Sequence, residues 1–441
     1  MAFVVGRTIG QARYPYASPA RIARDADRNV RRMIAHVYQQ VPFYRDTMRR
    51  LGLSPADIRT VADLARLPLI SVADLQRDPE AFRSPSRGDE PPAPLLTSGS
   101  TGSPHTVWHD LASIYTNAAD NERQRALVQR LIGKGPRYRV LSIAALRSAH
   151  DTLQQASRTG ALWPKWLALT RVVADDRQSY AEIAAQLNEV RPDELRGFGS
   201  RLAGLFLHLD ATGEPFHHPA LVVYASDTLP EPVRRLIVDK YGIPVFALYQ
   251  ASEALKLGWE CEAHDGYHIN ADHYPTRLVD AAGQDVAPGE TGEVVISNLT
   301  NRGTVLLNYR LGDLAQRLTA PCPCGRNLPR IGFLQGRAND TLLAADGQRC
   351  HWMPIERAIR QLDGVWQWQA TQSAPLQVTV ALRLRPDCDR DAIARGVVAA
   401  VRAVLGEAMA VEVRPVDELA PLVGGKIRHV VNLLDEPAGG D

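Results

Sequence analysis

The stretch TSGSTGSPHT, residues 97–106, directly follows the apolar pair Leu95-Leu96 and combines hydroxyl side chains with two glycines. Hydroxyl groups and backbone amides freed by glycine form a concave set of donors that suits an anion such as pyrophosphate. The stretch is not a Walker P-loop, because G-x-x-x-x-G-K-[ST] is absent. A Ser/Gly/Thr cluster by itself is more often a plain loop, so other segments have to decide what this one holds.

The composition indicates a globular protein of more than one domain. A chain of 441 residues is too long for one ordinary core, so two or three domains are expected. Hydrophobic residues make up 45% and charged residues 23%, with a net charge of +2. This balance excludes a nucleic-acid partner or a polybasic membrane surface. Neither a bilayer-spanning apolar stretch nor a cleavable leader is evident, so we predict a cytoplasmic protein.

Hydrophobic periodicity divides the chain into regions of different structure. Residues 18–52 repeat apolar positions at three- and four-residue spacing, which predicts helix. From about 110 to 250, helical patterns alternate with short apolar strands, as in an α/β sheet. Residues 268–318 are β-rich, with YPTRLVD, GEVVISNL and TVLLNYR as expected strands. Beyond about 340, two strands, an amphipathic helix and a further strand indicate a compact α+β unit.

These patterns predict an α/β fold of two domains. The first, large domain is expected over residues 1–338, with a helical segment at about 18–80 and a β-rich segment at about 258–330. A small α+β domain follows over residues 339–441.

A carboxylate and a hydroxyl lie where an expected strand ends. In LYQASEA, residues 248–254, Ser252 and Glu253 come shortly after the strand-like PVFAL. Such a pair at a strand exit can bind Mg²⁺ and a phosphate oxygen. Alone, Glu253 is more often a solvated or helix-capping residue.

Three further motifs follow in order. NYRLGDLAQ, residues 308–316, places Asp313 after a turn glycine, where it can accept hydrogen bonds from ribose hydroxyls or serve the turn itself. QGRAND, residues 335–340, lies between the large and small units. VGGKIRHV, residues 423–430, carries a lysine that in isolation is an ordinary surface charge.

Taken together, these motifs resemble the adenylate-forming superfamily. VPFYRDTMRRLGLSPADIRTVADLARLP, ASDTLPEPVRRLIVDKYGIPVFALYQASE and CPCGRNLPRIGFLQGR are similar to segments of its phenylacetate–CoA ligase branch. The resemblance runs from about residue 20 to residue 434.

The resemblance implies ATP-dependent activation of a carboxylic acid, with an aromatic acid favoured, release of pyrophosphate, and transfer of the acyl group to CoA. A second reading keeps the adenylation but delivers the acyl group to a carrier protein or an amine. A third is a nucleotide-binding relative without turnover. A homodimer is an expectation taken from the family alone.

The resemblance also implies roles for single residues. Ser252 would contact the α-phosphate, Glu253 would hold Mg²⁺, and Lys426 would reach from the small domain to the α-phosphate and the carboxylate. The β- and γ-phosphates would lie in the loop formed by Thr97, Ser98, Gly99, Ser100, Thr101 and Gly102.

The nucleoside and the acid would be held by other positions. Tyr249 would lie against the adenine or close the acid pocket, Asp313 would accept the ribose hydroxyls, and Arg337 would lie near ribose and phosphate. The further pocket candidates are Ser226, Asp227, Gln250, Trp163, Trp166 and Trp259, although large aromatic residues are more often part of a core.

Four positions depart from the family pattern. Ser103 and His105 stand where relatives place a lysine, and Gln250 replaces a glycine. Asn339 replaces the first acid of the pair at the expected hinge of the small domain. The loop DGQRCHWMPIE, residues 346–356, is more polar than the family's pantetheine-lining loop, which leaves the acceptor open.

The cysteines are clustered. Cys261 lies in WECEAHDGYH, and Cys322 and Cys324 form C-P-C-G. Three thiolates and an imidazole can complete a tetrahedral zinc site. The family position of GYHI favours His268 as the fourth ligand, with His264 as the alternative. Three free buried thiols beside a surface histidine are the structural alternative.

Overall fold

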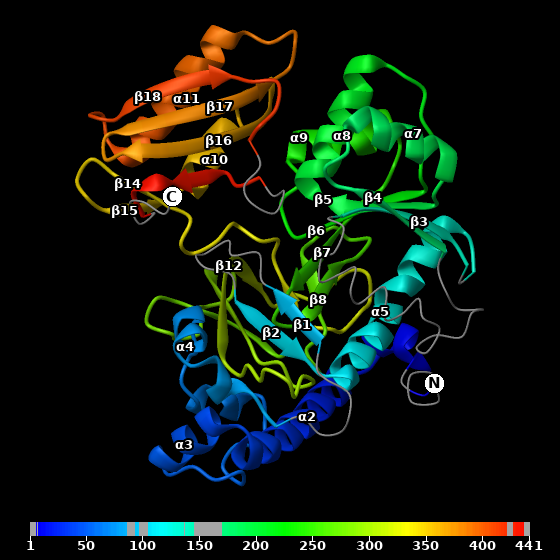
Figure 1. The fold of residues 1–441 in the computed structure, drawn as a ribbon, viewed down its shortest axis with the longest axis vertical. Helices are drawn as coiled ribbons and strands as arrows, with labels where there is room; N and C mark the ends of the chain where they lie inside the picture. Colours follow the sequence, from blue (N-terminus) through cyan, green and yellow to red (C-terminus); the bar gives the residue numbers. More distant parts are fainter. Residues whose placement is uncertain are drawn as a thin grey trace.

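The computed structural model describes most of the chain. The described residues are 6, 8–85, 93–96, 105–135, 137–144, 170–420 and 427–435. The expected phosphate-binding residues 97–102, Ser103, Lys426, Trp163 and Trp166 lie outside them. Figure 1 shows helices of the N-terminal region at one end, a large sheet in the middle and a small sheet from the C-terminal region at the other end.

The N-terminal region forms helices, as its periodicity predicts. The elements are η1 (Gln11–Tyr16), α2 (Pro19–Gln40), α3 (Pro42–Arg50), η2 (Ala62–Arg66), α4 (Val72–Arg77) and η3 (Pro79–Phe82). Ser18 caps α2, because its side chain accepts a hydrogen bond from the backbone N–H of Arg21, and a proline follows at the first helical position. The apolar stripe of α2, which includes Val30 and Ile34, is buried.

The middle of the chain forms the parallel half of an 11-stranded sheet. Its strands lie in the order β4 (Thr170–Asp175), β3 (Arg139–Ala144), β5 (Glu194–Phe198), β6 (Leu221–Ala225) and β7 (Val245–Ala251). Helix α5 (Leu111–Ile132) precedes these strands, and α7 (Tyr180–Val190), α8 (Gly199–Thr212), α9 (Glu231–Arg235) and the π-helical turn η4 (Leu236–Lys240) lie between them in the sequence.

Helices cover both faces of this parallel half. Val223 of β6 shares a core with Leu127 of α5, whereas the adjacent Val222 shares another with Ile183 of α7 and Leu202 of α8. Neighbouring residues of a strand point to opposite faces, so α5 lies on one face and α7 and α8 lie on the other. The predicted α/β fold is therefore confirmed.

The β-rich segment continues the same sheet in antiparallel pairing. The strands beyond β7 are β8 (Leu255–Glu260), β9 (Tyr267–Ile269), β13 (Arg330–Ile331), β12 (Tyr309–Leu318), β11 (Thr291–Ile296) and β10 (Thr276–Val279), in that order. A separate hairpin pairs β1 (Ala93–Leu96) with β2 (Thr106–His109). The expected strand TVLLNYR is only partly regular, because β12 begins at Tyr309.

Asn308 explains the irregularity before β12 and joins two parts of the chain. Its backbone has a positive φ of 54°, which asparagine tolerates better than most residues. Its side-chain amide donates hydrogen bonds to the carbonyls of Leu64 and Leu67, at 2.6 and 2.9 Å, and its own carbonyl accepts one from the N–H of Ile70. These hydrogen bonds attach the N-terminal helices to the chain directly before β12.

The C-terminal region packs around a core of its own. It contains the hairpin β14 (Thr341–Leu343) and β15 (Arg349–His351), the helices α10 (Met353–Ile359) and α11 (Arg390–Leu405), and the short η5 (Leu433–Asp435). Its four-stranded sheet has the order β18 (Ala410–Pro415), β17 (Gln377–Leu384), β16 (Val365–Ala374) and β19 (Val430–Asn432). The core runs from Leu342 to Val430. The exact boundary at residue 338 stays a prediction, and no described helix is long and apolar enough to cross a membrane.

Replacing Asn308 by alanine is expected to destabilise the large unit by about 2–4 kcal/mol, because two buried carbonyls lose their donors. The shift of the urea unfolding midpoint measures this effect. Asn188→Ala is the matched control, because Asn188 also makes two side-chain hydrogen bonds to the backbone but at an exposed position. Equal shifts for the two variants would show that Asn308 does not hold the helices to β12.

Candidate functional site

The turn between β7 and β8 carries the predicted hydroxyl and carboxylate. Ser252 and Glu253 lie in this turn, at the end where the parallel strands leave the sheet. The Glu253 side chain is 12% exposed, and its Oε1 lies 3.6 Å from Nε2 of His105. The hydroxyl of Tyr309 donates a hydrogen bond to the same oxygen at 3.5 Å. An acidic group is thus held in a nearly buried position at the edge of the sheet.

Glu253 carries a negative charge in this environment. Burial by itself would raise the pKa of the Glu253 carboxyl, but hydrogen bonds from His105 and from a backbone amide oppose it. The positive charge of Arg337 adds to their effect, and the pKa lies below its usual value. His105 is the basic side chain that lies against this carboxylate.

His109, which the sequence patterns did not single out, supports the same turn. Its Nε2 donates a hydrogen bond to the carbonyl of Ser252 at 2.7 Å. Burial lowers the pKa of His109, so the ring is neutral and donates from this one nitrogen. The sequence feature that could have identified His109 is the alternation in TVWH, which places this histidine on the buried side of β2.

Asp313 contacts both Tyr249 and Arg337. The hydroxyl of Tyr249 donates a hydrogen bond to Oδ2 of Asp313 at 2.8 Å, and Nε of Arg337 lies 3.6 Å from Oδ1. Burial, followed by the charge of Asp313, raises the pKa of Tyr249 well above its ordinary value, so its hydroxyl keeps its proton. The three residues come from β7, β12 and the segment after β13, and a hydrogen bond and an ion pair join them into one group.

Asp313 lies in a strand rather than in a turn. It is part of β12, and the pairing register with β11 shifts at this place, opposite Glu293 and Val295. Gly312 has a φ of 79° within the irregularity. A bulge of this kind redirects a side chain, and here it accompanies the contact of Asp313 with Tyr249. The motif identified the residue, but the expected turn was wrong.

The segment between the two units is held by residues of the polar loop 346–356. Nε2 of His351 donates a hydrogen bond to the carbonyl of Arg337 at 2.9 Å. Gly336 has a φ of 86°, and a Cβ there would come within 2.5 Å of the Trp352 ring. Trp352 is 5% exposed and stacks on His429 at 4.6 Å between ring centroids. These loop residues therefore pack on the connection between the units.

The remaining pocket candidates have different surroundings. Asp227 accepts hydrogen bonds from the side chain and the backbone N–H of Ser200, at the N-terminal end of α8. Ser226 precedes it with a positive φ of 74° at the end of β6. Trp259 is buried beside His268, with ring centroids 5.5 Å apart. Of the two possibilities for Trp259, the structure favours a core residue, because its ring belongs to the core next to the cysteines.

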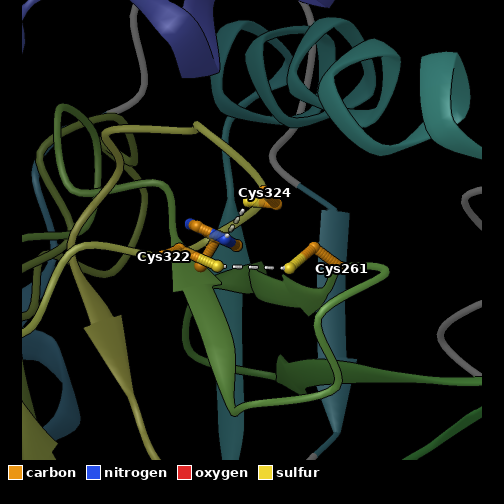
Figure 2. A group of neighbouring side chains, drawn as sticks. Cys261, Cys322 and Cys324 are labelled. Atoms are coloured by element: carbon orange, nitrogen blue, oxygen red, sulfur yellow. Dashed lines mark hydrogen bonds between the residues drawn. The ribbon is translucent and has the colours of Figure 1, made fainter.

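Three cysteines and one histidine converge at the far end of β8 (Figure 2). The ligand atoms of Cys261, His268, Cys322 and Cys324 all lie within 4.8 Å of one another. The sulfurs of Cys261 and Cys322 are 3.6 Å apart, and Cys324 Sγ lies 3.3 Å from Nε2 of His268. No disulfide joins them. Four donors at these separations fit one metal ion.

His268, rather than His264, belongs to this cluster. Nδ1 of His268 donates to the carbonyl of Leu328 at 3.2 Å, which leaves Nε2 to face the sulfurs. Burial lowers the pKa of His268 to about 4, so its ring is neutral, as a metal ligand must be. His264 is 43% exposed, and its Nδ1 lies 2.7 Å from the Glu260 carboxylate instead.

Comparisons with known proteins find ligases among the relatives of the chain. No family model matches the chain. The phenylacetate-coenzyme A ligase of Thermus thermophilus is 26% identical over 329 residues, 72% of this chain and 70% of that protein. The phenylacetate-coenzyme A ligase of Pseudomonas putida is 26% identical over 370 residues, 80% of each chain. That of Escherichia coli is 28% identical over 324 residues, 70% of each chain.

Solved structures share the fold over nearly the whole chain. A 2-hydroxyisobutyryl-CoA ligase, in a postadenylation state, has a TM-score of 0.74 at 18% identity, covering 94% of this chain and 90% of that one. A benzoate CoA ligase from Burkholderia xenovorans has a TM-score of 0.53 at 18% identity, covering 82% and 78%. By these comparisons the chain is an AMP-forming CoA ligase that is similar in sequence to phenylacetate-coenzyme A ligases and similar in fold to other CoA ligases.

Proposed function

We propose that this ligase converts a carboxylic acid, with an aromatic acid favoured, into its CoA thioester. In the first step, a carboxylate oxygen attacks the α-phosphorus of ATP and pyrophosphate leaves. In the second, the CoA thiol loses its proton, its sulfur attacks the acyl carbon, and AMP leaves. Little bond chemistry falls to side chains in such a reaction, so positioning and charge account for the catalysis.

The observation that carries this proposal is the convergence at the end of β7. Glu253 supplies an ionised, nearly buried carboxylate, the ligand type that Mg²⁺ prefers. Bound there, Mg²⁺ would neutralise charge on the phosphates. Ser252 adjoins it and would contact the α-phosphate. The loop 97–102 and Lys426 keep their predicted roles toward the departing pyrophosphate and the reacting oxygens, outside the described residues.

The Asp313 group would hold the nucleoside. A ribose offers two neighbouring hydroxyls, and a carboxylate accepts from both. Tyr249 already donates to one Asp313 oxygen and Arg337 lies near the other, so the carboxylate is fixed in orientation. The hydrogen bond from His351 to the Arg337 carbonyl ties this group to the small unit, and Asn339 and Asp340 follow as the proposed hinge.

The aromatic acid is favoured by the relatives. Their names specify phenylacetate, and structures of similar fold include a benzoate ligase and an anthranilate ligase. CoA is proposed as the acceptor because the names of the same relatives specify coenzyme A ligases.

We also propose that the Cys/His cluster holds a structural Zn²⁺. Its four ligands are all supplied by protein, and structural sites of this composition are closed to substrate. The ion would fix the loop of Cys322 and Cys324 to β8 and β9. The same loop reaches the N-terminal segment, because the N–H of Asn327 donates to the carbonyl of Pro15 at 2.7 Å. The ion would therefore also support the packing of η1.

Incubation with ATP, Mg²⁺ and a panel of aryl and alkyl acids tests the first step by pyrophosphate release. CoA, a carrier protein and amines are added separately to identify the acceptor. Glu253→Gln keeps the shape but removes the charge, and it is expected to lower the rate about 10²–10³-fold. Glu214→Gln is the control, because Glu214 is exposed on the loop after α8.

Several results would contradict the proposal at different points. An absence of pyrophosphate with every acid of a broad panel would refute the ligase reaction. An acyl-adenylate that CoA never consumes would refute the acceptor. A Glu253→Gln enzyme with the wild-type rate and Mg²⁺ dependence would refute the role of Glu253.

Asp313→Asn tests the ribose contact. The wild-type enzyme is expected to prefer ATP over 2′-deoxy-ATP in kcat/KM, and the variant is expected to lose about tenfold of that preference, since hydrogen bonds to charged groups contribute about 1.5–3 kcal/mol. Tyr249→Phe should raise KM for ATP by a smaller factor, because it removes only a neighbouring donor. A preference for ATP that is unchanged in Asp313→Asn would show that Asp313 does not contact the 2′-hydroxyl.

Metal analysis of the desalted protein is expected to find about one zinc per chain. Cys322→Ser and His268→Ala should lose the metal and lower the thermal midpoint. His264→Ala should retain the metal, since this side chain faces Glu260. A folded wild-type protein free of metal would refute the zinc site.

A further inference from the structure

The buried lysine of β8 has an unusual environment. Lys256 is 4% exposed, and its Nζ donates a hydrogen bond of 2.8 Å to the side-chain carbonyl of Gln124 on α5. Within the described part of the chain, no carboxylate pairs with this ammonium group. Burial, with the positive charges of Arg196 and Arg171, lowers the pKa of Lys256 to about 7. A buried ammonium group with a neutral partner is costly unless another acceptor reaches it.

A register shift directs Lys256 toward the α5 face of the sheet. Tyr249 pairs with Gly258, but the next residue, Gln250, pairs with Lys256, so Leu257 is the extra residue of a bulge. Leu257 belongs to the core on the opposite face, while Trp259 belongs to the core under α5. Residues directly opposite in a pair share a face. Lys256 therefore lies on the same face as Gln250, two positions before Ser252.

Further polar groups lie on this face of the sheet, on β5 and β3, and the charges of Arg196 and Glu194 on β5 act on Lys256. Ser142 of β3 pairs with Arg196 of β5, so their side chains are on one face, and Glu194 lies two residues before Arg196. Oε1 of Glu194 accepts a hydrogen bond of 2.7 Å from Nε of Arg196. The hydroxyl of Ser142 and Oε2 of Glu194 are buried, and neither has a hydrogen-bond partner among the described residues. Buried polar atoms without partners are rare in folded proteins and indicate a missing ligand group.

We propose that Lys256, Gln124, Glu194 and Ser142 form a subsite that recognises an oxygen-bearing substituent, a hydroxyl or a second carboxylate, on the acid remote from its reacting carboxylate. The inference rests on the proposed ligase function and adds a substrate class to it. The reacting carboxylate lies near Ser252 and Glu253 in that function, and Gln250 connects this place to Lys256 across the β7–β8 pair. A hydroxyl or a carboxylate can accept from Lys256, and a hydroxyl on the same acid can donate to Glu194, which lies farther along this face.

This subsite predicts strong discrimination between matched acids. A site built to hydrogen-bond a substituent rejects the analogue that lacks it, because its own polar groups then stay buried and unpaired. The rejection can reach about 10⁴-fold, whereas an apolar pocket discriminates a single hydroxyl by only about 10²-fold. The side chain of Lys256 is a specificity determinant in this view and takes no part in the bond chemistry.

The test compares kcat/KM for pairs of acids that differ in one substituent, such as benzoic, hydroxybenzoic and benzenedicarboxylic acids, and phenylacetic and hydroxyphenylacetic acids. The wild-type enzyme is expected to prefer an oxygen-bearing member at least tenfold. Lys256→Met should reduce this ratio at least tenfold. Gln124→Glu, which is isosteric and gives the lysine an internal carboxylate partner, should reduce it as well. Lys240→Met is the control and should keep the ratio, because Lys240 is exposed and paired with Asp210.

The thermal midpoint separates a binding role from a structural one. If the lysine serves a ligand, Gln124→Glu should keep or raise the midpoint while the preference falls. A wild-type ratio below threefold for every pair, or an unchanged ratio in both variants, would refute the subsite even though the acids are adenylated. An absence of pyrophosphate with every acid would refute the ligase function itself and the subsite with it.

Discussion

The turn between β7 and β8 is the constraint on which the rest of the site depends. On one side β7 pairs in parallel with β6, and on the other it pairs antiparallel with β8, so the chain has to reverse direction where Ser252 and Glu253 lie. Both carbonyls of this pair are held, since His109 donates to that of Ser252 and the Asn298 side chain donates to that of Glu253 at 2.9 Å. A turn fixed by pairing and by hydrogen bonds places the acidic group with little freedom, and preorganisation of this kind favours electrostatic catalysis.

The sequence predicts those helices and strands that bury one face, because their apolar residues recur at regular spacing. The stripe of α2 and the strands and helix of the small unit form as expected, because burial of one face leaves a regular pattern along the chain. Shifts in strand register leave no such pattern. The irregularity that accompanies the contact of Asp313 with Tyr249, and the bulge at Leu257 that turns Lys256 toward α5, depend on pairing with distant strands. Alternation alone would assign Lys256 to the other face.

The candidate metal ligands also show which features the sequence predicts and which require the structure. Chemistry and spacing leave two histidines available to the cysteines, and the family pattern favours His268. The structure separates them by their partners, since His264 faces Glu260 and His268 is oriented by the Leu328 carbonyl. His109 was not predicted, because a lone histidine in a short strand is usually an ordinary core residue. Its importance follows from its contact with Ser252, 143 positions away in the sequence.

The position of Trp352 at the connection between the units makes it a natural reporter of their movement. Its indole packs against Gly336 on one side of the connection between the units and stacks on His429. A rotation of the small unit about residues 339 and 340 would carry the indole away from Gly336 and change its surroundings. The protein therefore contains an intrinsic fluorophore at its proposed hinge, through which the order and rates of conformational steps can be followed without an added label.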